Sequence, residues 1–306
     1  MRNLKVLVAE STGLEGSAVA LWLLANGHDV IAMTRDLAHP MAMRLMRRGA
    51  RLAWADPADQ AAIEESMQGC DALFLAHRPD EDPEATVSNG TTIVDTAAAT
   101  GLQHVVYSSV PAAHEPTGLP HFDSRHAVET RLAQQSVPHT VVAPAWLMEN
   151  FASDRFIDQF REGRLALPYP ANRKLQQVAV DDVARFVALA LEQPADFVGR
   201  RFALAGDELT GLEMAATFAR VLGRPLRYEE QPLAAAWAAD ARVAGTFEFL
   251  ARTEPMVDVA ALRERFDINW HTLDGWARRQ SWDGVLGSGG QDARGSARKG
   301  PASRGS

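Results

Sequence analysis

The chain has 306 residues, of which 46% are apolar, and a formal net charge of −8 at pH 7. This length and apolar content predict a substantial core, in one large domain or in a nucleotide-binding domain with a smaller partner. The negative charge argues against a surface for nucleic acid or for an anionic membrane, because both need dense lysine and arginine, so we expect a small-molecule ligand or a protein partner.

The apolar segments are too short to cross a bilayer, and the first residues pass into a candidate strand without a secretory segment. We therefore expect a cytoplasmic protein. The single cysteine, Cys70, excludes an intrachain disulfide and a metal site built from cysteines.

Short runs rich in Val, Leu and Ala alternate with helical stretches over the first half of the chain. The candidate strands are Leu4–Ala9, Asp29–Thr34, Ala50–Asp56, Ala72–Ala76, His104–Ser108 and Thr140–Ala143. Near-continuous apolar strands separated by helices indicate a parallel sheet covered on both faces. We predict a doubly wound α/β domain of the dinucleotide-binding type over residues 1–150.

The pattern then changes to a smaller, helix-rich lobe on the substrate side, predicted over residues 151–285. It includes a strand at Arg201–Ala205, a helix capped by Asp181 and Asp182, and a helix with Thr210 at its N-cap. Residues 286–306 are predicted to be a disordered basic tail, because they offer too little apolar surface to offset the entropy of ordering.

The first strand is followed by the turn Glu10-Ser11-Thr12-Gly13-Leu14-Glu15-Gly16 and a helix. Glycines in such a turn let backbone N–H groups approach a pyrophosphate and let helix and strand pack closely. We predict that Thr12, Gly13 and Gly16 bind a dinucleotide. However, Glu10 takes the first glycine place, and repulsion of a phosphate at about 4 Å would cost roughly 4 kcal/mol. The alternative is a turn that keeps its packing glycines and has lost the phosphate.

The second strand ends in "VIAMTRD". An arginine directly after this strand typically accepts a 2′-phosphate, whereas an acid there would hold a free ribose. Arg35 therefore favours NADP(H) over NAD(H), although a solvated surface arginine is the alternative and Asp36 weakens the argument.

Segments along most of the chain carry a family resemblance. They are "STGLEG", "AMTRD", "GCDALFLA", "HVVYSSV", "HFDSRHAVETRLAQQSVPHTVVAPAWLMENF", "QQVAVDDVARFVALAL" and "GRRFALAGDELTGLEMAATFARVLGRPLRY". In this order they resemble the NmrA-like family of atypical short-chain dehydrogenases/reductases. The resemblance implies a Rossmann fold and one of several functions: an NADPH-binding quinone-type reductase, a redox-sensing regulator or an enzyme of specialised metabolism. The chain departs from the family pattern at Glu10 for glycine, Arg125 for lysine and Ala143 for arginine.

Short-chain dehydrogenases normally use a tyrosine four residues before a lysine, and none of the three tyrosines in this chain has that partner. His121 and Arg125 occupy the equivalent spacing. A histidine near its ordinary pKa can act as general acid or base, and Arg125 could bind an anionic group of the cofactor. The alternative for His121 is a polar cluster that caps a helix.

Further candidates follow the fourth, fifth and sixth strands, at the carboxyl edge where doubly wound sheets bind ligands. Ser109 is a candidate catalytic hydroxyl, and Ser108, His77 and Trp146 are candidate substrate contacts, Trp146 as a wall for an aromatic substrate. The alternatives are capping serines, a loop histidine and core packing. The nine histidines show no metal-ligand spacing, so no metal is predicted.

Three functions follow from these residues. The first is an NADP(H)-dependent reductase of a quinone-like or enone-like small molecule, with a proton from water or His121. The second is a non-catalytic NADP(H)-sensing regulator. The third is a cyclase, dehydratase or isomerase that has lost cofactor binding, which the changes at Glu10, Arg125 and Ala143 favour.

Overall fold

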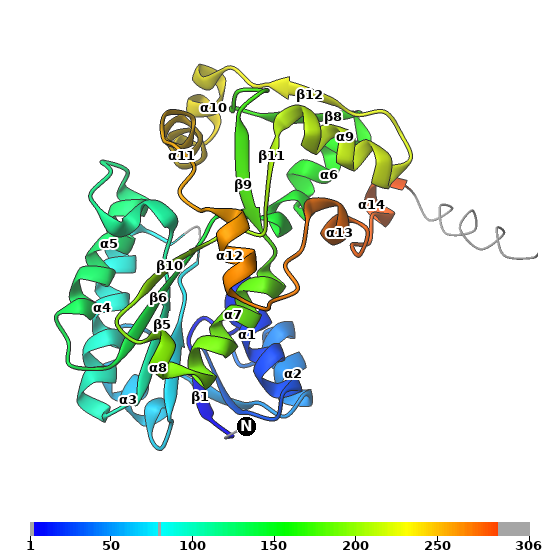
Figure 1. Ribbon diagram of the computed structural model, residues 1–306. Coiled ribbons are helices and arrows are strands. Elements are labelled where there is room, and N and C mark those ends of the chain that lie inside the picture. The colour runs from blue at the N-terminus through cyan, green and yellow to red at the C-terminus, as the bar shows by residue number, and fades with distance from the viewer. Residues whose placement is uncertain (1–2, 79–80, 287–306) are drawn as a thin grey trace, which may run out of the picture.

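The chain is built around a seven-stranded parallel sheet with strand order β10-β6-β5-β4-β1-β2-β3 (Figure 1). The computed structural model describes residues 3–78 and 81–286, so the predicted tail from residue 287 onward lies outside the described residues. The strands are β1 Lys5–Val8, β2 Asp29–Thr34, β3 Arg51–Trp54, β4 Ala72–Leu75, β5 His104–Ser108, β6 His139–Pro144 and β10 Arg201–Leu204. The doubly wound α/β fold is confirmed.

Helices cover both faces of this sheet. One face packs against α1 Leu14–Ala25, α2 Pro40–Arg47, α7 Val180–Glu192 and α8 Pro194–Phe197. The other packs against α3 Gln60–Met67, α4 Pro83–Thr100 and α5 Pro120–Ala133. Val6, Leu7 and Val8 are fully buried although they point alternately to the two faces, which explains why the strands are apolar throughout.

The strand expected in the smaller lobe belongs to the large sheet. β10 pairs with β6, with Phe202 opposite Val142, and α7 packs beside α1. The apolar pattern predicted the strand but held no information on its partner, because a parallel pairing is made after a long crossover. The large α/β unit is therefore not confined to the first 150 residues.

The smaller lobe has its own sheets and core, and it lies above the large sheet in Figure 1. Its strands are β7 Trp146–Leu147, β8 Arg164–Leu167, β9 Lys174–Val178, β11 Asp207–Thr210 and β12 Arg227–Glu230. Its helices are α6 Asp154–Arg161, α9 Gly211–Leu222, α10 Leu233–Ala239, α11 Ala241–Arg252, α13 Leu273–Ala277 and α14 Asp283–Leu286. The helix α12 Val259–Arg265 and the 3₁₀ turns Pro111–His114 and Met148–Ala152 complete the described elements. Thr210 caps α9 in a capping box, as predicted.

The predicted cap of α7 is different in the structure. The N–H of Val180 donates to Glu149 at 3.0 Å, so a carboxylate from another segment accepts the first helix donor. Asp182 is fully buried and instead accepts a hydrogen bond from His271 at 2.7 Å. This partner lies far along the chain, and spacing alone cannot reveal it.

Candidate active site

The turn after β1 keeps the backbone that a glycine would need. Glu10 has φ of +53°, and it is the only non-glycine residue with positive φ in the described part of the chain. A side chain there costs roughly 1–2 kcal/mol, so the position favours glycine on steric grounds alone. A Cβ on Gly16 would lie 2.2 Å from the Glu10 carbonyl oxygen, so no other residue fits there without moving the turn.

The N-terminus of α1 is open to a ligand. Gly13 is its N-cap and supplies no side-chain cap, and Thr12 makes no side-chain hydrogen bond to any described residue. The Ser11 hydroxyl and N–H both donate to the Met33 carbonyl, at 2.8 and 3.3 Å, and so fix the turn to β2. Unpaired N–H groups at a helix N-terminus form a typical anion site.

Arg35 lies beside this turn, directly after β2. Its side chain is exposed and makes no ion pair within the described residues. Asp36 is turned to its own loop, where its carboxylate accepts the N–H of Ala38 at 2.9 Å. The Asp36 carboxylate, which weakened the prediction of NADP(H) from Arg35, is therefore already hydrogen-bonded within its loop.

A cavity of about 560 Å³ lies between the carboxyl ends of β5 and β6 and the smaller lobe. It brings together the predicted residues His77, Ser108, Ser109, His121, Arg125 and Trp146. The smaller lobe contributes Tyr169, Arg173, Arg242, Thr246 and Met256. Thr12, Gly13, Gly16 and Arg35 do not line it, but they follow β1 and β2 and therefore lie along the same edge of the sheet.

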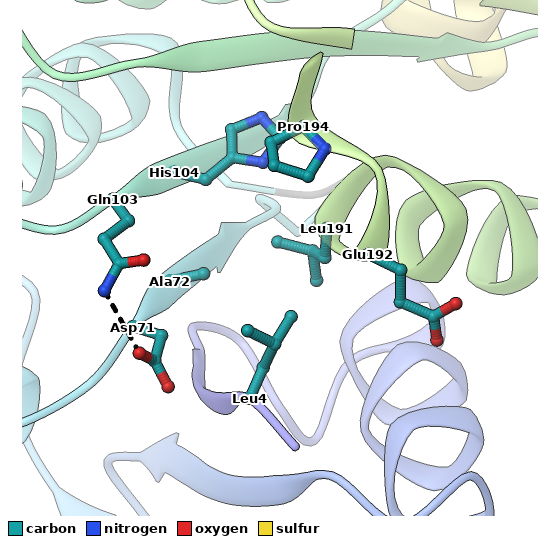
Figure 2. Close-up of a pocket in the computed structure, with 8 residues that line it drawn as sticks. All are labelled: Leu4, Asp71, Ala72, Gln103, His104, Leu191, Glu192 and Pro194. Carbon is teal, nitrogen blue, oxygen red and sulfur yellow. Dashed lines mark hydrogen bonds between the residues drawn. The ribbon is translucent and has the colours of Figure 1, made fainter. Parts of the chain in front are cut away.

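Another cavity, of about 190 Å³, lies at the opposite edge, where β4 and β5 begin (Figure 2). Its polar wall includes Asp71 and Gln103, which are hydrogen-bonded at 3.2 Å, and His104. It contains none of the predicted site residues.

The two neighbouring serines at the end of β5 are each hydrogen-bonded to a different glutamate. The Ser108 hydroxyl donates to Glu15, which also lines the cavity. The Ser109 hydroxyl donates to Glu129, and Arg201 pairs with Glu129 at 2.9 Å. Both serines are about 5% exposed or less, so these contacts are shielded from solvent.

Glu15 is a residue that the sequence analysis did not select. Burial raises the pKa of its carboxyl, and the hydrogen bond from Ser108 and the charge of Arg125 offset this only in part. Its place between the turn glycines, in the first turn of α1, was the available signal, because side chains there face the carboxyl edge of the sheet.

The pKa of His121 is lower than that of an ordinary histidine. Its Nε2 is bonded to the Thr246 hydroxyl at 2.8 Å, across the cavity wall between α5 and α11. Burial, with the nearby guanidinium groups of Arg242 and Arg125, lowers the pKa of His121 to about 4. This pKa is lower than the ordinary value assumed from the sequence, so the neutral ring is a poor general acid at pH 7.

His77 is buried at the back of the cavity. Its Nδ1 lies 3.2 Å from Glu81, and burial lowers the pKa of His77 to about 4. Its Nε2 is buried without a hydrogen-bond partner among the described residues. A neutral ring that donates Nδ1–H to Glu81 therefore keeps Nε2 as an acceptor.

Arg125 and Trp146 also present unpaired buried donors. The Nη2 of Arg125 donates to the Arg78 carbonyl at 3.1 Å, while Nη1 of Arg125 and Nε1 of Trp146 have no partner in the part of the chain that the structure describes. The Trp146 ring packs on Phe247 with centroids 4.9 Å apart. Buried polar atoms are rarely left unpaired, so these donors favour a ligand in the cavity.

Two further searches cover the described residues only. No group of His, Cys, Asp and Glu there could hold a metal ion. None of the helices described is both long and apolar enough to span a bilayer.

The chain is similar to known reductases along most of its length. It is 30% identical over 227 residues to a (4-alkanoyl-5-oxo-2,5-dihydrofuran-3-yl)methyl phosphate reductase of Streptomyces griseus, which covers 74% of this chain and 76% of that protein. It is 24% identical over 228 residues to quinone oxidoreductase 2 of Escherichia coli, with 73% and 77% covered.

Solved structures share the fold. NmrA, a negative transcriptional regulator in complex with NADP, superposes with a TM-score of 0.77 at 20% identity, covering 91% of this chain and 95% of that one. The model of the NmrA-like family matches residues 2–262. The chain therefore belongs to the NmrA-like family.

Proposed function

We propose that this protein is an NADP(H)-dependent reductase of a quinone-like or enone-like small molecule. The observation that carries the proposal is the cavity at the ends of β5 and β6, which combines two serine hydroxyls, unpaired buried donors and an aromatic wall. Ligands of doubly wound sheets bind at this edge.

The residues of the turn fit a bound NADP(H). The open N-terminus of α1 would hold the pyrophosphate. Gly16 allows the helix to pack closely against the turn. Arg35, exposed and unpaired among the described residues, would hold the 2′-phosphate. The carboxylate of Glu10 opposes the phosphates, whereas burial favours the neutral form of Glu15, which would not repel them. When bound, the cofactor supplies a hydride.

The relatives support a conjugated carbonyl substrate. The name of the Streptomyces griseus relative describes an oxo-dihydrofuran with an alkanoyl group, so its ring double bond is conjugated to carbonyl groups, as in an enone. A quinone is the substrate type named for the Escherichia coli relative. In this chain, Trp146 offers a flat apolar face, and Ser108 or Ser109 can donate to a carbonyl oxygen.

Two other functions keep support from particular residues. Glu10, with Arg125 and Ala143, favours a non-redox enzyme that no longer holds a pyrophosphate. The similarity to NmrA favours a regulator that binds NADP(H) without turnover.

The test is calorimetric titration of the purified protein with NADPH and NADH, followed by turnover assays with a panel of quinones and enones. We expect micromolar NADPH binding, weaker NADH binding and substrate-dependent NADPH oxidation. Binding without turnover would favour the regulator. The absence of dinucleotide binding would overturn the proposal and leave the non-redox enzyme.

A further inference from the structure

We propose that Glu15 is the proton source of the cavity and that it delivers the proton to the substrate through the hydroxyl of Ser108. The inference rests on the proposed reductase function. It assigns a proton donor in a chain that lacks the usual tyrosine–lysine pair. Glu15 acts through Ser108, and Ser108 is the group that contacts the substrate.

The two side chains come together from distant segments. Glu15 lies in the first turn of α1 and Ser108 at the end of β5, yet their side chains are hydrogen-bonded and both line the cavity. The pair therefore links a carboxyl group in the cavity wall to a hydroxyl in the same wall. A carboxyl separated from the reacting oxygen by one bridging group can serve as general acid.

The neighbouring pair shows why Ser108 and not Ser109 is assigned. Both serine hydroxyls donate to a glutamate, and the difference lies in the acceptor. Glu129 is paired with Arg201 at 2.9 and 3.2 Å, so Ser109 bonds a carboxyl group that a guanidinium already holds. Glu15 forms no such ion pair with any residue the structure describes. Two carboxyl groups in such different surroundings are the usual arrangement when one of them stores a proton.

The other titratable groups near the cavity are poor donors at pH 7. The pKa of His77 and that of His121 are lowered to about 4, chiefly by burial, so both rings are neutral. Tyr107 is fully buried, and burial raises its pKa. Burial also raises the pKa of Glu15, which favours the protonated form of this carboxyl.

The step balances with one hydride and one proton. When the electron-poor carbon of the substrate accepts a hydride with its electron pair, the π electrons move to the conjugated carbonyl oxygen. For this step the protonated carboxyl group of Glu15 donates to the Ser108 oxygen, which reverses the hydrogen bond in the structure and frees the Ser108 proton for the substrate. The substrate oxygen takes the Ser108 proton, and Ser108 takes the proton of Glu15. Glu15 is left as a carboxylate and regains a proton from water, so the reaction consumes one solvent proton per substrate reduced.

The test uses Glu15→Gln, which keeps a hydrogen-bonding side chain of the same size but cannot release a proton. We expect kcat/KM with NADPH and an active quinone or enone to fall about 100-fold or more. The wild-type rate should decline as the pH rises and Glu15 ionises, and this decline should be absent from the variant. NADPH affinity measured by calorimetry should stay within about threefold.

Ser108→Ala should reduce kcat/KM to the same degree, and the double variant should be no slower than either single variant, because both act in one step. The matched control is Glu149→Gln, since Glu149 is also a buried carboxyl but does not line the cavity. It should keep the wild-type rate and pH profile.

An infrared difference spectrum of the free protein gives a readout that needs no turnover. At neutral pH, the spectrum of wild type minus that of Glu15→Gln should show the band of a protonated carboxyl group, because any signal from Glu149 is present in both proteins and cancels. The absence of this band from the difference spectrum would overturn the inference. A Glu15→Gln variant with the wild-type rate and the wild-type pH profile would also overturn it. If wild type reduces no quinone or enone, the proposed function fails and the delivery step falls with it, while the band still reports whether Glu15 stores a proton.

Discussion

The ends of β1 and β2 and the ends of β5 and β6 lie on the same edge of one sheet, yet they are built differently. At the first pair, the backbone N–H groups of the α1 N-terminus and the exposed side chain of Arg35 can bind an anion. Glu10 adopts a positive φ there, which is a strained backbone conformation for a residue with a side chain. At the second pair, buried side chains from both lobes surround a cavity and bond to one another. Ligand binding at the first region therefore depends on the close backbone packing of the turn and on charge. The chemistry at the second region depends on the protonation of buried side chains.

The largest expected effect tests the backbone space of the turn. In Gly16→Ala, the new Cβ would lie 2.2 Å from the Glu10 carbonyl oxygen, so the turn must open. We expect the free energy of unfolding to fall by about 3 kcal/mol and NADPH binding to be lost. Gly13→Ala is the matched control, because its Cβ would lie 3.2 Å from the same oxygen. Equal stability of the two variants in urea titrations would contradict this description of the turn.

A smaller effect is expected for the pH dependence of stability, which reports the protonation of the buried carboxyl group of Glu149. Burial raises the pKa of this carboxyl to about 7, although it accepts hydrogen bonds from the Val180 N–H and from Trp276. Since its pKa in the unfolded chain is about 4.3, its contribution to stability is complete below about pH 4 and is lost as the pH rises through 7.

Between about pH 5 and pH 8, the unfolding free energy of wild type should therefore fall by about 2 kcal/mol more than that of Glu149→Gln. Thermal or urea unfolding over this range measures the difference. Parallel pH profiles for the two proteins would show that Glu149 does not titrate in the folded state.

Arg35→Ala tests the electrostatic part of the turn. We expect NADPH affinity to fall about 20-fold while NADH affinity is unchanged, because only NADPH carries the 2′-phosphate. Arg51→Ala is a suitable control, since Arg51 is exposed at the start of β3, on the opposite edge of the sheet. A loss of both affinities in calorimetry would assign Arg35 to the stability of the turn.

The smallest effect separates charge from strain at Glu10. Glu10→Gly removes both, and Glu10→Gln removes only the charge, because glutamine meets the same penalty at φ of +53°. We expect about tenfold tighter NADPH binding in both variants and greater thermal stability in Glu10→Gly alone. Unchanged affinity in both would show that the carboxylate faces away from the phosphates.

The sequence predicts the fold well because the strands are apolar on both faces. This pattern can be recognised without knowing which strands pair. It predicts the strand at Arg201 but not its place in the large sheet. The strand-end residues Ser108, Ser109 and Trp146 could be selected because parallel strands end at one edge. The place of Glu15 between the turn glycines was a signal in the sequence, but its bond to Ser108 at the end of β5 could not be predicted from spacing. The lowered pKa of His121 depends on its burial and on Arg242 in a distant helix.

The place of β10 has a consequence for the synthesis of the protein. The edge of β6 stays unpaired until β10 has left the ribosome, and the core around it also needs Phe266 and Trp270. A nascent or truncated chain that stops near residue 150 would present an open, apolar strand edge, which is a common start of aggregation. Folding of the large unit is therefore completed only after Trp270 has been synthesised, and a chaperone that covers this edge in the meantime would raise the yield.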